Sequence, residues 1–240
     1  MKPLIMIPVR MAATRLPGKP LADIGGKPMI VRAWEQAMKS GFRVAVAAGD
    51  AQIISAIQNV GGDSVLTDPD LPSGSDRILA AARMIDPDGA HDIIINIQGD
   101  MPFASPDLAL ACAKLLARES ACDIATLAAA ETGPTDRSNP DVVKAVLALP
   151  EHATSGRALY FTRSTLYGDG PVWRHVGIYG YRRPALERFC AAPQSPLEKR
   201  EKLEQLRAME MGLQIWASVI GEAPLSVDNP ADLEAARALA

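Results

Sequence analysis

Short, mostly apolar runs alternate with helix-periodic segments through the first half of this chain, and this alternation constrains the fold more than any other feature. The runs predicted as strands are residues 4–7, 42–48, 64–67, 92–97 and 123–128, and the segments with helical spacing are 29–38, 50–57, 75–82 and 107–119. A continuous apolar run is typical of a strand covered on both faces, and strand–helix alternation favours right-handed crossovers. We therefore predict an α/β fold with a mostly parallel sheet.

The pattern changes beyond Pro134. Three strand-like segments follow one another there, with short connections that contain proline and glycine: residues 142–147, 158–162 and 172–181. Such spacing favours antiparallel pairing. We expect an inserted sheet at about 134–195 within a single domain of residues 1–240.

The last quarter of the chain returns to helices. Ser195-Pro196-Leu197-Glu198 combines an N-cap, a first-turn proline and a capping-box glutamate, which predicts a helix from there to about Gly212. A strand at 214–219 follows, and Asn229-Pro230 precedes a final helix that runs through Leu239.

Composition limits the partners of the chain. Its net charge of −3 gives no overall basic field that would hold a nucleic-acid backbone, so an anion site must be a local cluster. The three cysteines are widely spaced without a Cys-x-x-Cys pair, which indicates neither a disulfide framework nor a zinc site. No apolar run approaches the roughly 18–20 residues of a membrane span. We expect a cytoplasmic protein with a small anionic substrate and with neither nucleic acid nor a membrane as partner.

The loop at residues 8–20 follows the first predicted strand and carries three cations, Arg10, Arg15 and Lys19. Ligands bind at the carboxyl ends of strands in an open α/β sheet, so the loop is suited to a polyanion such as a nucleoside triphosphate. Neither common phosphate fingerprint is present, because Lys19 is followed by Pro20 and no Gly-x-Gly-x-x-Gly follows a strand. A solvated basic surface loop is the alternative that these residues leave open.

The segment Ser73-Gly74-Ser75-Asp76-Arg77 starts the helix predicted after the third strand. Ser75 is suited to the N-cap position, and Asp76 suits the positive end of a helix. Arg77 is electrostatically unfavourable in a first helical turn unless it faces an anion. The segment is therefore either an ordinary helix start or part of a ligand site.

Two aspartates are candidates for a metal site. Asp100 follows Gly99 after the strand 92–97, which places it at the ligand edge of the sheet. Mg²⁺ is usually held by one or two carboxylates plus substrate phosphates, so Asp100 and Asp228 would be sufficient. The alternatives are a turn residue for Asp100 and an ordinary helix start for Asp228.

Eight short motifs are distributed over the chain. They are residues 15–21 (RLPGKPL), 26–30 (GKPMI), 73–77 (SGSDR), 98–100 (QGD), 174–182 (RHVGIYGYR), 195–198 (SPLE), 203–207 (LEQLR) and 227–228 (VD). Together they resemble the motifs of the 3-deoxy-manno-octulosonate cytidylyltransferase family, also called CMP-Kdo synthetases. The similarity runs in register from about residue 4 to about residue 236, and several such motifs together are highly specific.

The resemblance implies the reaction CTP + Kdo → CMP-Kdo + pyrophosphate, where Kdo is 3-deoxy-D-manno-octulosonate. In this family the step depends on Mg²⁺ and supplies lipopolysaccharide biosynthesis in Gram-negative bacteria. The resemblance also implies a homodimer with a Rossmann-like, three-layer nucleotidyltransferase core. A small antiparallel subregion would contribute to the dimer contact and to sugar binding.

By position, the resemblance also implies site residues. Those implied for nucleotide binding are Pro8, Arg10, Arg15, Lys19, Ser73, Gly74, Ser75, Arg77, Gln98 and Asp100. Those implied for catalysis are Lys19, Arg15, Asp100 and Asp228, of which Asp100 and Asp228 would bind Mg²⁺. Those implied for the sugar acid are Gln98, Arg163, His175, Tyr179, Glu204 and Gln205.

Strand periodicity supports part of the implied sugar site. His175 and Tyr179 are an even number of residues apart, so they project from one face of a strand, with room over Gly177. A core histidine satisfied by local hydrogen bonds is the alternative for His175. The solvated side of an amphipathic helix is the alternative for Glu204 and Gln205.

Two departures from the family pattern bear on the substrate. Ala13 stands where the family usually has a serine, and the segment 164–172 is shorter than the usual loop. The missing serine hydroxyl concerns a contact with the nucleotide, whereas the short segment borders the implied sugar pocket and dimer contact, so the 8-amino-8-deoxy derivative of Kdo is an alternative substrate. A cytidylyltransferase for a sialate-like acid should have a different phosphate loop, and a non-catalytic nucleotide-binding regulator would have little need for both Asp100 and Asp228.

Overall fold

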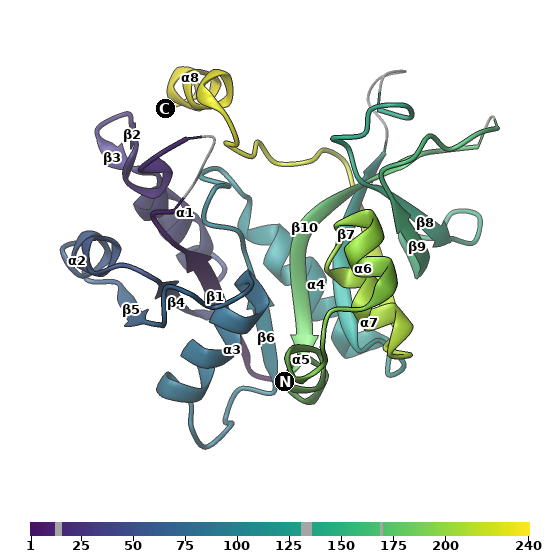
Figure 1. The fold of residues 1–240 in the computed structure, drawn as a ribbon, viewed down its shortest axis with the longest axis horizontal. Helices are drawn as coiled ribbons and strands as arrows, with labels where there is room; N and C mark the ends of the chain where they lie inside the picture. The colour runs from purple at the N-terminus through teal and green to yellow at the C-terminus, as the bar shows by residue number, and fades with distance from the viewer. Residues whose placement is uncertain (13–15, 131–135, 169) are drawn as a thin grey trace. The chain divides into compact units, whose positions relative to one another are not determined.

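The chain forms two compact units (Figure 1). The computed structural model describes residues 1–12, 16–130, 136–168 and 170–240. Unit 1 contains Met1–Leu110 and Pro224–Ala240, and unit 2 contains Ala111–Ala223. The chain leaves unit 1 within helix α4 (Pro106–Arg118). Among the described residues, no helix is both long enough and apolar enough to cross a membrane.

Unit 1 is built on a parallel sheet that follows the predicted strands. The predicted strands correspond to β1 (Pro3–Val9), β4 (Arg43–Ala48), β5 (Asp63–Leu66) and β6 (Ile93–Asn96). Two short strands of unit 1, β2 (Asp23–Ile24) and β3 (Lys27–Pro28), were not predicted. The parallel pairings run in the order β5-β4-β1-β6, and β2 and β3 form a separate antiparallel ribbon. All of β1 except its first residue is buried, as expected of a continuous apolar run with a neighbour on each side.

The helical segments of unit 1 also follow the predicted pattern. The predicted helices correspond to α1 (Met29–Met38), α2 (Ala51–Gln58), α3 (Gly74–Ile85) and α8 (Pro230–Ala238). The 3₁₀ helix η1 (Lys19–Leu21) was not predicted, and it begins within the segment predicted as a loop. The prediction of Ser75 as the N-cap of α3 is wrong. The extended backbone that a cap requires lies at Ser73 (φ −142°, ψ 170°), whose hydroxyl accepts the Asp76 N–H at 3.2 Å, and Ser75 is buried in the first turn.

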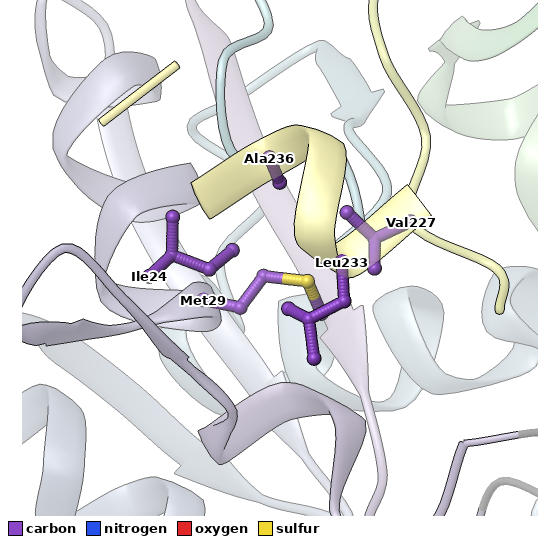
Figure 2. Close-up of a cluster of buried hydrophobic side chains, with 5 residues drawn as sticks. All are labelled: Ile24, Met29, Val227, Leu233 and Ala236. Atoms are coloured by element: carbon purple, nitrogen blue, oxygen red, sulfur yellow. The ribbon is translucent and has the colours of Figure 1, made fainter. Parts of the chain in front are cut away.

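The segment after Pro224 packs against the first elements of unit 1. Figure 2 shows five buried apolar side chains that meet there: Ile24, Met29, Val227, Leu233 and Ala236. Fully burying one of the larger of these side chains contributes about 1.5–3 kcal/mol. Asn229 caps α8 in a capping box with Asp232, which confirms the predicted helix start. The cluster therefore fixes the position at which α8 begins.

The described residues of unit 2 form five strands and three further helices. They are β7 (Ile124–Ala130), β8 (Lys144–Ala148), β9 (Ser155–Thr162), β10 (Trp173–Arg182), β11 (Ile215–Ile220), α5 (Arg183–Ala191), α6 (Pro196–Glu201) and α7 (Gln205–Glu210). The strand order is β10-β7-β11-β9-β8, and β8 also pairs with β10, so the pairings close on themselves. Of these five pairings between the described strands of unit 2, only that of β7 with β11 is parallel.

The prediction of a mostly parallel sheet is wrong. Antiparallel pairings prevail in unit 2, and the antiparallel part is larger than the small subregion that the sequence indicated. The connection from β8 to β9 is short and these two strands pair antiparallel, whereas parallel neighbours need a crossover of a dozen or more residues. The other antiparallel pairings of unit 2 join strands that are not consecutive in the chain: β10 with β7, β10 with β8, and β11 with β9. A short connection therefore explains the pairing of β8 with β9, and the other three antiparallel pairings depend on which distant strands meet.

Two helical details of unit 2 differ from the predicted pattern. The helix predicted from Ser195 to Gly212 is divided into α6 and α7, because Lys202 adopts a left-handed conformation (φ 54°). The capping box of Ser195 and Glu198 is confirmed. Helix α5 was not predicted, because it follows β10 directly and its N-cap, Arg182, makes no side-chain capping bond.

Candidate active site

A cavity of about 280 Å³ lies in unit 1 beside the carboxyl ends of β1 and β6, where ligands bind in open α/β sheets. Its walls include eight of the ten residues implied for nucleotide binding: Pro8, Arg10, Lys19, Ser73, Gly74, Arg77, Gln98 and Asp100. Of the other two, Ser75 is buried in α3 and Arg15 lies outside the described residues. Gln98, which was implied for both substrates, donates from its amide to Asn96 Oδ1 at 3.3 Å within unit 1.

Lys19 brings two carboxylates together beside this cavity. Its Nζ lies 2.8 Å from Asp100 Oδ2 and 3.6 Å from Asp228 Oδ1, and it donates to the Val227 carbonyl oxygen at 2.9 Å. The side chains of Lys19 and Asp100 are 16% and 26% exposed, so their charges are screened less than those of a surface pair. The fold thus creates a compact charge cluster from residues that are distant in the sequence.

The two carboxylates of this cluster fit a divalent cation. They converge on one positive group, and carboxylate oxygens are the ligands that Mg²⁺ prefers. In the part of the chain that the structure describes, no three His, Cys, Asp or Glu side chains are grouped so as to hold a metal ion. Asp100 and Asp228 would therefore hold Mg²⁺ together with phosphate oxygens of a ligand, which is the usual arrangement for this ion.

Backbone contacts fix the spacing of the two aspartates. The Val227 N–H donates to the Asp100 carbonyl oxygen at 2.9 Å, and the Val227 side chain is buried in the cluster of Figure 2. The Asp228 N–H donates to Asp232 Oδ2 at 2.9 Å, at the start of α8. The apolar packing of α8 therefore sets where the Asp228 carboxylate lies relative to Asp100.

Arg77 lines the cavity, but protein oxygens already accept from its guanidinium. The acceptors are Thr67 Oγ1 at 2.5 Å, Asp68 O at 3.0 Å and Pro69 O at 3.1 Å. Burial, and after it the positive charge of Arg10, lowers the pKa of Arg77. The electrostatic problem of a cation in the first turn of α3 is thus met by hydroxyl and carbonyl oxygens. A contact of Arg77 with a nucleotide stays a prediction.

Gly49 lies between the two arginines of the cavity. A Cβ atom at this position would lie 3.0 Å from Arg77 Nη1 and 3.2 Å from Arg10 Cβ. The Gly49 N–H donates to the Val9 carbonyl oxygen at 2.9 Å, which continues the pairing of β1 with β4. A side chain at residue 49 would therefore shift at least one of the arginines by a few tenths of an ångström.

Asp50 is a residue that the sequence reasoning missed. Its Oδ2 accepts the Met11 N–H at 2.7 Å, and so it holds the start of the cationic loop. Gly49-Asp50 follows β4 as Gly99-Asp100 follows β6, and this repeated Gly-Asp after a strand was the signal that could have identified it.

In unit 2, His175 and Tyr179 lie on one face of β10, as predicted, with ring centroids 5.4 Å apart. Between Val176 and Tyr179 the strand bulges, because β10 advances three residues while β7 advances one. The two extra residues are an even number, so the side chains on either side of the bulge keep the same face. A Cβ atom on Gly177 would meet no atom within 4 Å, which confirms that the space over this residue is open.

Burial favours the neutral forms of His175 and Tyr179, and Glu204 is their charged neighbour. Burial lowers the pKa of His175 to about 4, and burial together with the negative charge of Glu204 raises the pKa of Tyr179. Glu204 pairs with Arg207 Nη2 at 3.0 Å. Gln205 is only 7% exposed, so it is not on the solvated side of a helix.

Arg163 belongs to a different group of contacts in unit 2. Its Nη1 donates to the Pro140 carbonyl oxygen at 3.1 Å, and its own carbonyl oxygen accepts from Lys144 Nζ at 2.6 Å. Lys144 is fully buried and also donates to the Asn139 carbonyl oxygen at 2.9 Å. Burial, and then the charge of Arg163, lowers the pKa of Lys144. A lysine within the apolar run 142–147 was the only sequence signal of this buried anchor.

The chain is similar over its length to known cytidylyltransferases. A sequence model of the family described as "Cytidylyltransferase" matches residues 4–215. The 3-deoxy-manno-octulosonate cytidylyltransferase of Parvibaculum lavamentivorans is 56% identical over 98% of this chain and 92% of its own length. The protein of the same name from Methylobacterium sp. (strain 4-46) is 53% identical over 99% of this chain and 96% of its own length.

A solved structure agrees with the sequence relatives. It is that of CMP:2-keto-3-deoxy-manno-octonic acid synthetase complexed with CTP, with a TM-score of 0.91 and 36% identity, covering 100% of this chain and 98% of that chain. The fold is thus an α/β nucleotidyltransferase fold like that of this synthetase. With more than half of its residues identical to such relatives over nearly its whole length, the chain belongs to the 3-deoxy-manno-octulosonate cytidylyltransferase family.

Proposed function

We propose that the protein transfers the CMP group of CTP to the anomeric hydroxyl of Kdo and so forms CMP-Kdo and pyrophosphate. The observation that carries this proposal is the cluster of Lys19, Asp100 and Asp228 beside a cavity lined by most of the implied nucleotide-binding residues. The family membership and the relative complexed with CTP support the same reaction. A non-catalytic regulator would not need this arrangement of charges.

In the proposed reaction, the anomeric oxygen of Kdo forms a bond to the α-phosphorus of CTP. The bond between the α-phosphorus and the oxygen that bridges it to the β-phosphorus breaks, and pyrophosphate leaves. The proton of the anomeric hydroxyl passes to solvent. Such transfers need positioning and charge stabilisation more than covalent chemistry from the protein. Lys19 and Arg10 would neutralise phosphate oxygens. Bound Mg²⁺, held by Asp100 and Asp228, would supply further neutralisation of the phosphates.

The remaining assignments rest on the resemblance and are part of the proposal. The residues of unit 2 proposed for the sugar acid are Arg163, His175, Tyr179, Glu204 and Gln205. The region at about 134–195 would contribute to sugar binding and to the contact of a homodimer within one cytidylyltransferase domain. The reaction would take place in the cytoplasm, where CTP is available, and would supply lipopolysaccharide biosynthesis.

Pyrophosphate release with CTP and Mg²⁺, measured with and without Kdo, tests the proposed reaction. We expect release only when Kdo is present, and folded protein that releases none would contradict the proposal. Competition between Kdo and 8-amino-8-deoxy-Kdo in the same assay decides between the two sugars. Preferential use of the amino sugar would show that it, and not Kdo, is the substrate of the same reaction.

Gly49→Ala is expected to raise the KM for CTP by about threefold, because the new methyl group would push Arg77 or Arg10 away from its present position by a few tenths of an ångström. Initial rates at varied CTP concentration measure the effect. Gly221→Ala is the matched control, since a Cβ atom there meets nothing within 4 Å. A KM for CTP that Gly49→Ala leaves at the wild-type value would show that the arginines do not depend on this close approach.

A further inference from the structure

Thr126 of β7 is a fully buried polar residue to which the proposed reaction assigns no role. Its hydroxyl oxygen lies 3.0 Å from His175 Nε2, 2.9 Å from the Ile178 carbonyl oxygen and 3.2 Å from the Val176 carbonyl oxygen. The last two belong to the bulge of β10. Thr126 therefore joins the bulge to the one histidine on the implied sugar face.

The number of protons determines the direction of these hydrogen bonds. A threonine hydroxyl has one proton, and carbonyl oxygens only accept. If the proton pointed to His175 Nε2, the hydroxyl oxygen would face two carbonyl oxygens at 2.9 and 3.2 Å with no hydrogen between them, which is repulsive. The hydroxyl thus donates to the bulge and accepts from Nε2, so Nε2 carries the hydrogen.

We propose that Thr126 is a positioning residue that holds His175 in the neutral tautomer with hydrogen on Nε2, so that Nδ1 accepts a hydrogen bond from a hydroxyl of the sugar acid. The ligand in this inference rests on the proposed function, whereas the tautomer rests on the geometry alone. A carboxylate oxygen brings no proton and would be repelled by the Nδ1 lone pair. The acid end of the substrate therefore lies away from His175.

The surroundings of the ring agree with this role. Burial lowers the pKa of His175 to about 4, so the ring is neutral at pH 7 and Nδ1 has its lone pair. Phe161 packs edge-on against the ring with centroids 4.9 Å apart, and Tyr179 lies on the same face. Among the described residues, several buried side-chain atoms lack a hydrogen-bond partner, and His175 Nδ1 is not one of them. The adjacent space over Gly177 is open.

Nitrogen-15 NMR of the histidine-labelled full-length protein tests the tautomer without a mutation at Thr126. The chain has three histidines, so a His175→Gln spectrum identifies the resonances of His175. We expect the hydrogen on Nε2 in the wild type at pH 7. Hydrogen on Nδ1, or an even mixture of tautomers, would overturn the inference whatever the activity.

Two variants test the consequence for the substrate. Thr126→Val keeps the branched shape but removes the hydroxyl, and it should give mixed tautomers and raise the KM for Kdo about tenfold, with kcat and the KM for CTP close to wild type. Thr126→Ser keeps the hydroxyl and should restore both the tautomer and the KM. A Thr126→Val protein with wild-type tautomer and KM would contradict the proposal, and if this variant does not fold, the wild-type spectrum and Thr126→Ser decide. Absence of Kdo-dependent turnover in the wild type would instead refute the proposed function and leave the tautomer result standing.

Discussion

Replacing Asp100 by asparagine is expected to lower kcat by about a thousandfold while the protein stays folded. The substitution removes the charge 2.8 Å from Lys19 Nζ and one of the two carboxylates available to a metal ion. The amide keeps the size of the side chain, so the loss would be one of charge and not of packing. Pyrophosphate release should be measured over a wide range of Mg²⁺ concentration, and we expect no recovery at the upper end.

The control for this substitution is Asp63→Asn. Asp63 is a carboxylate of the same unit, 62% exposed, whose contact with Arg43 is at 3.5 Å. Exposed pairs of this kind contribute about 0–1 kcal/mol, so the control should have wild-type activity and stability. Near-normal turnover of Asp100→Asn, or full rescue by added Mg²⁺, would remove Asp100 from its proposed role at the reacting phosphates.

Replacing Lys19 by methionine is expected to lower kcat by about 10²–10³-fold, with little change in the KM for Kdo. The ammonium would stabilise charge that develops on phosphate oxygens, and an interaction that strengthens in the transition state affects kcat more than binding. Steady-state rates at varied CTP and Kdo separate these parameters. Lys27→Met is the control, because Lys27 is a half-exposed lysine paired with Glu35 in the same unit.

The Lys19 variant has a second measurable consequence. Without the ammonium, Asp100 and Asp228 would lose the positive charge that lies near both carboxylates in the absence of metal. The midpoint of thermal unfolding should therefore rise more on addition of Mg²⁺ in Lys19→Met than in the wild type. An equal rise in both proteins, or an effect of the substitution only on the KM for Kdo, would place Lys19 outside the phosphate and metal site.

The parallel part of the fold could be predicted because its signals are local. Runs such as Leu4–Ile7 and Ile93–Ile95 are apolar throughout, and the helices between strands carry their own periodicity, so β1, β4 and β6 were identified. The pairing in unit 2 depends on which distant strands meet, and no local pattern encodes that choice. The bulge of β10 was also invisible, yet the face shared by His175 and Tyr179 was predicted correctly because two extra residues preserve the alternation.

The residues of the candidate site also differ in whether the sequence alone could identify them. Residues that follow a strand or carry a charge in an unexpected place, such as Lys19, Asp100 and Arg77, could be found in the sequence. Thr126 and Lys144 could not, because they act through backbone carbonyl oxygens that only the folded chain brings near them. Their side chains give no periodic signal, and a buried lysine is rare enough that a strand pattern alone does not suggest it.

During translation, Lys19 leaves the ribosome 208 residues before Val227, its carbonyl partner. All of unit 2 is synthesised between the two parts of unit 1, and at the usual rates of about 5–20 residues per second this takes on the order of 10 s. Until then the nascent chain has Lys19 and Asp100 but lacks Asp228. Under the proposed mechanism, an interrupted polypeptide has the phosphate loop without the complete pair of acidic ligands. Under the same mechanism, only polypeptides that extend past Asp228 would consume CTP.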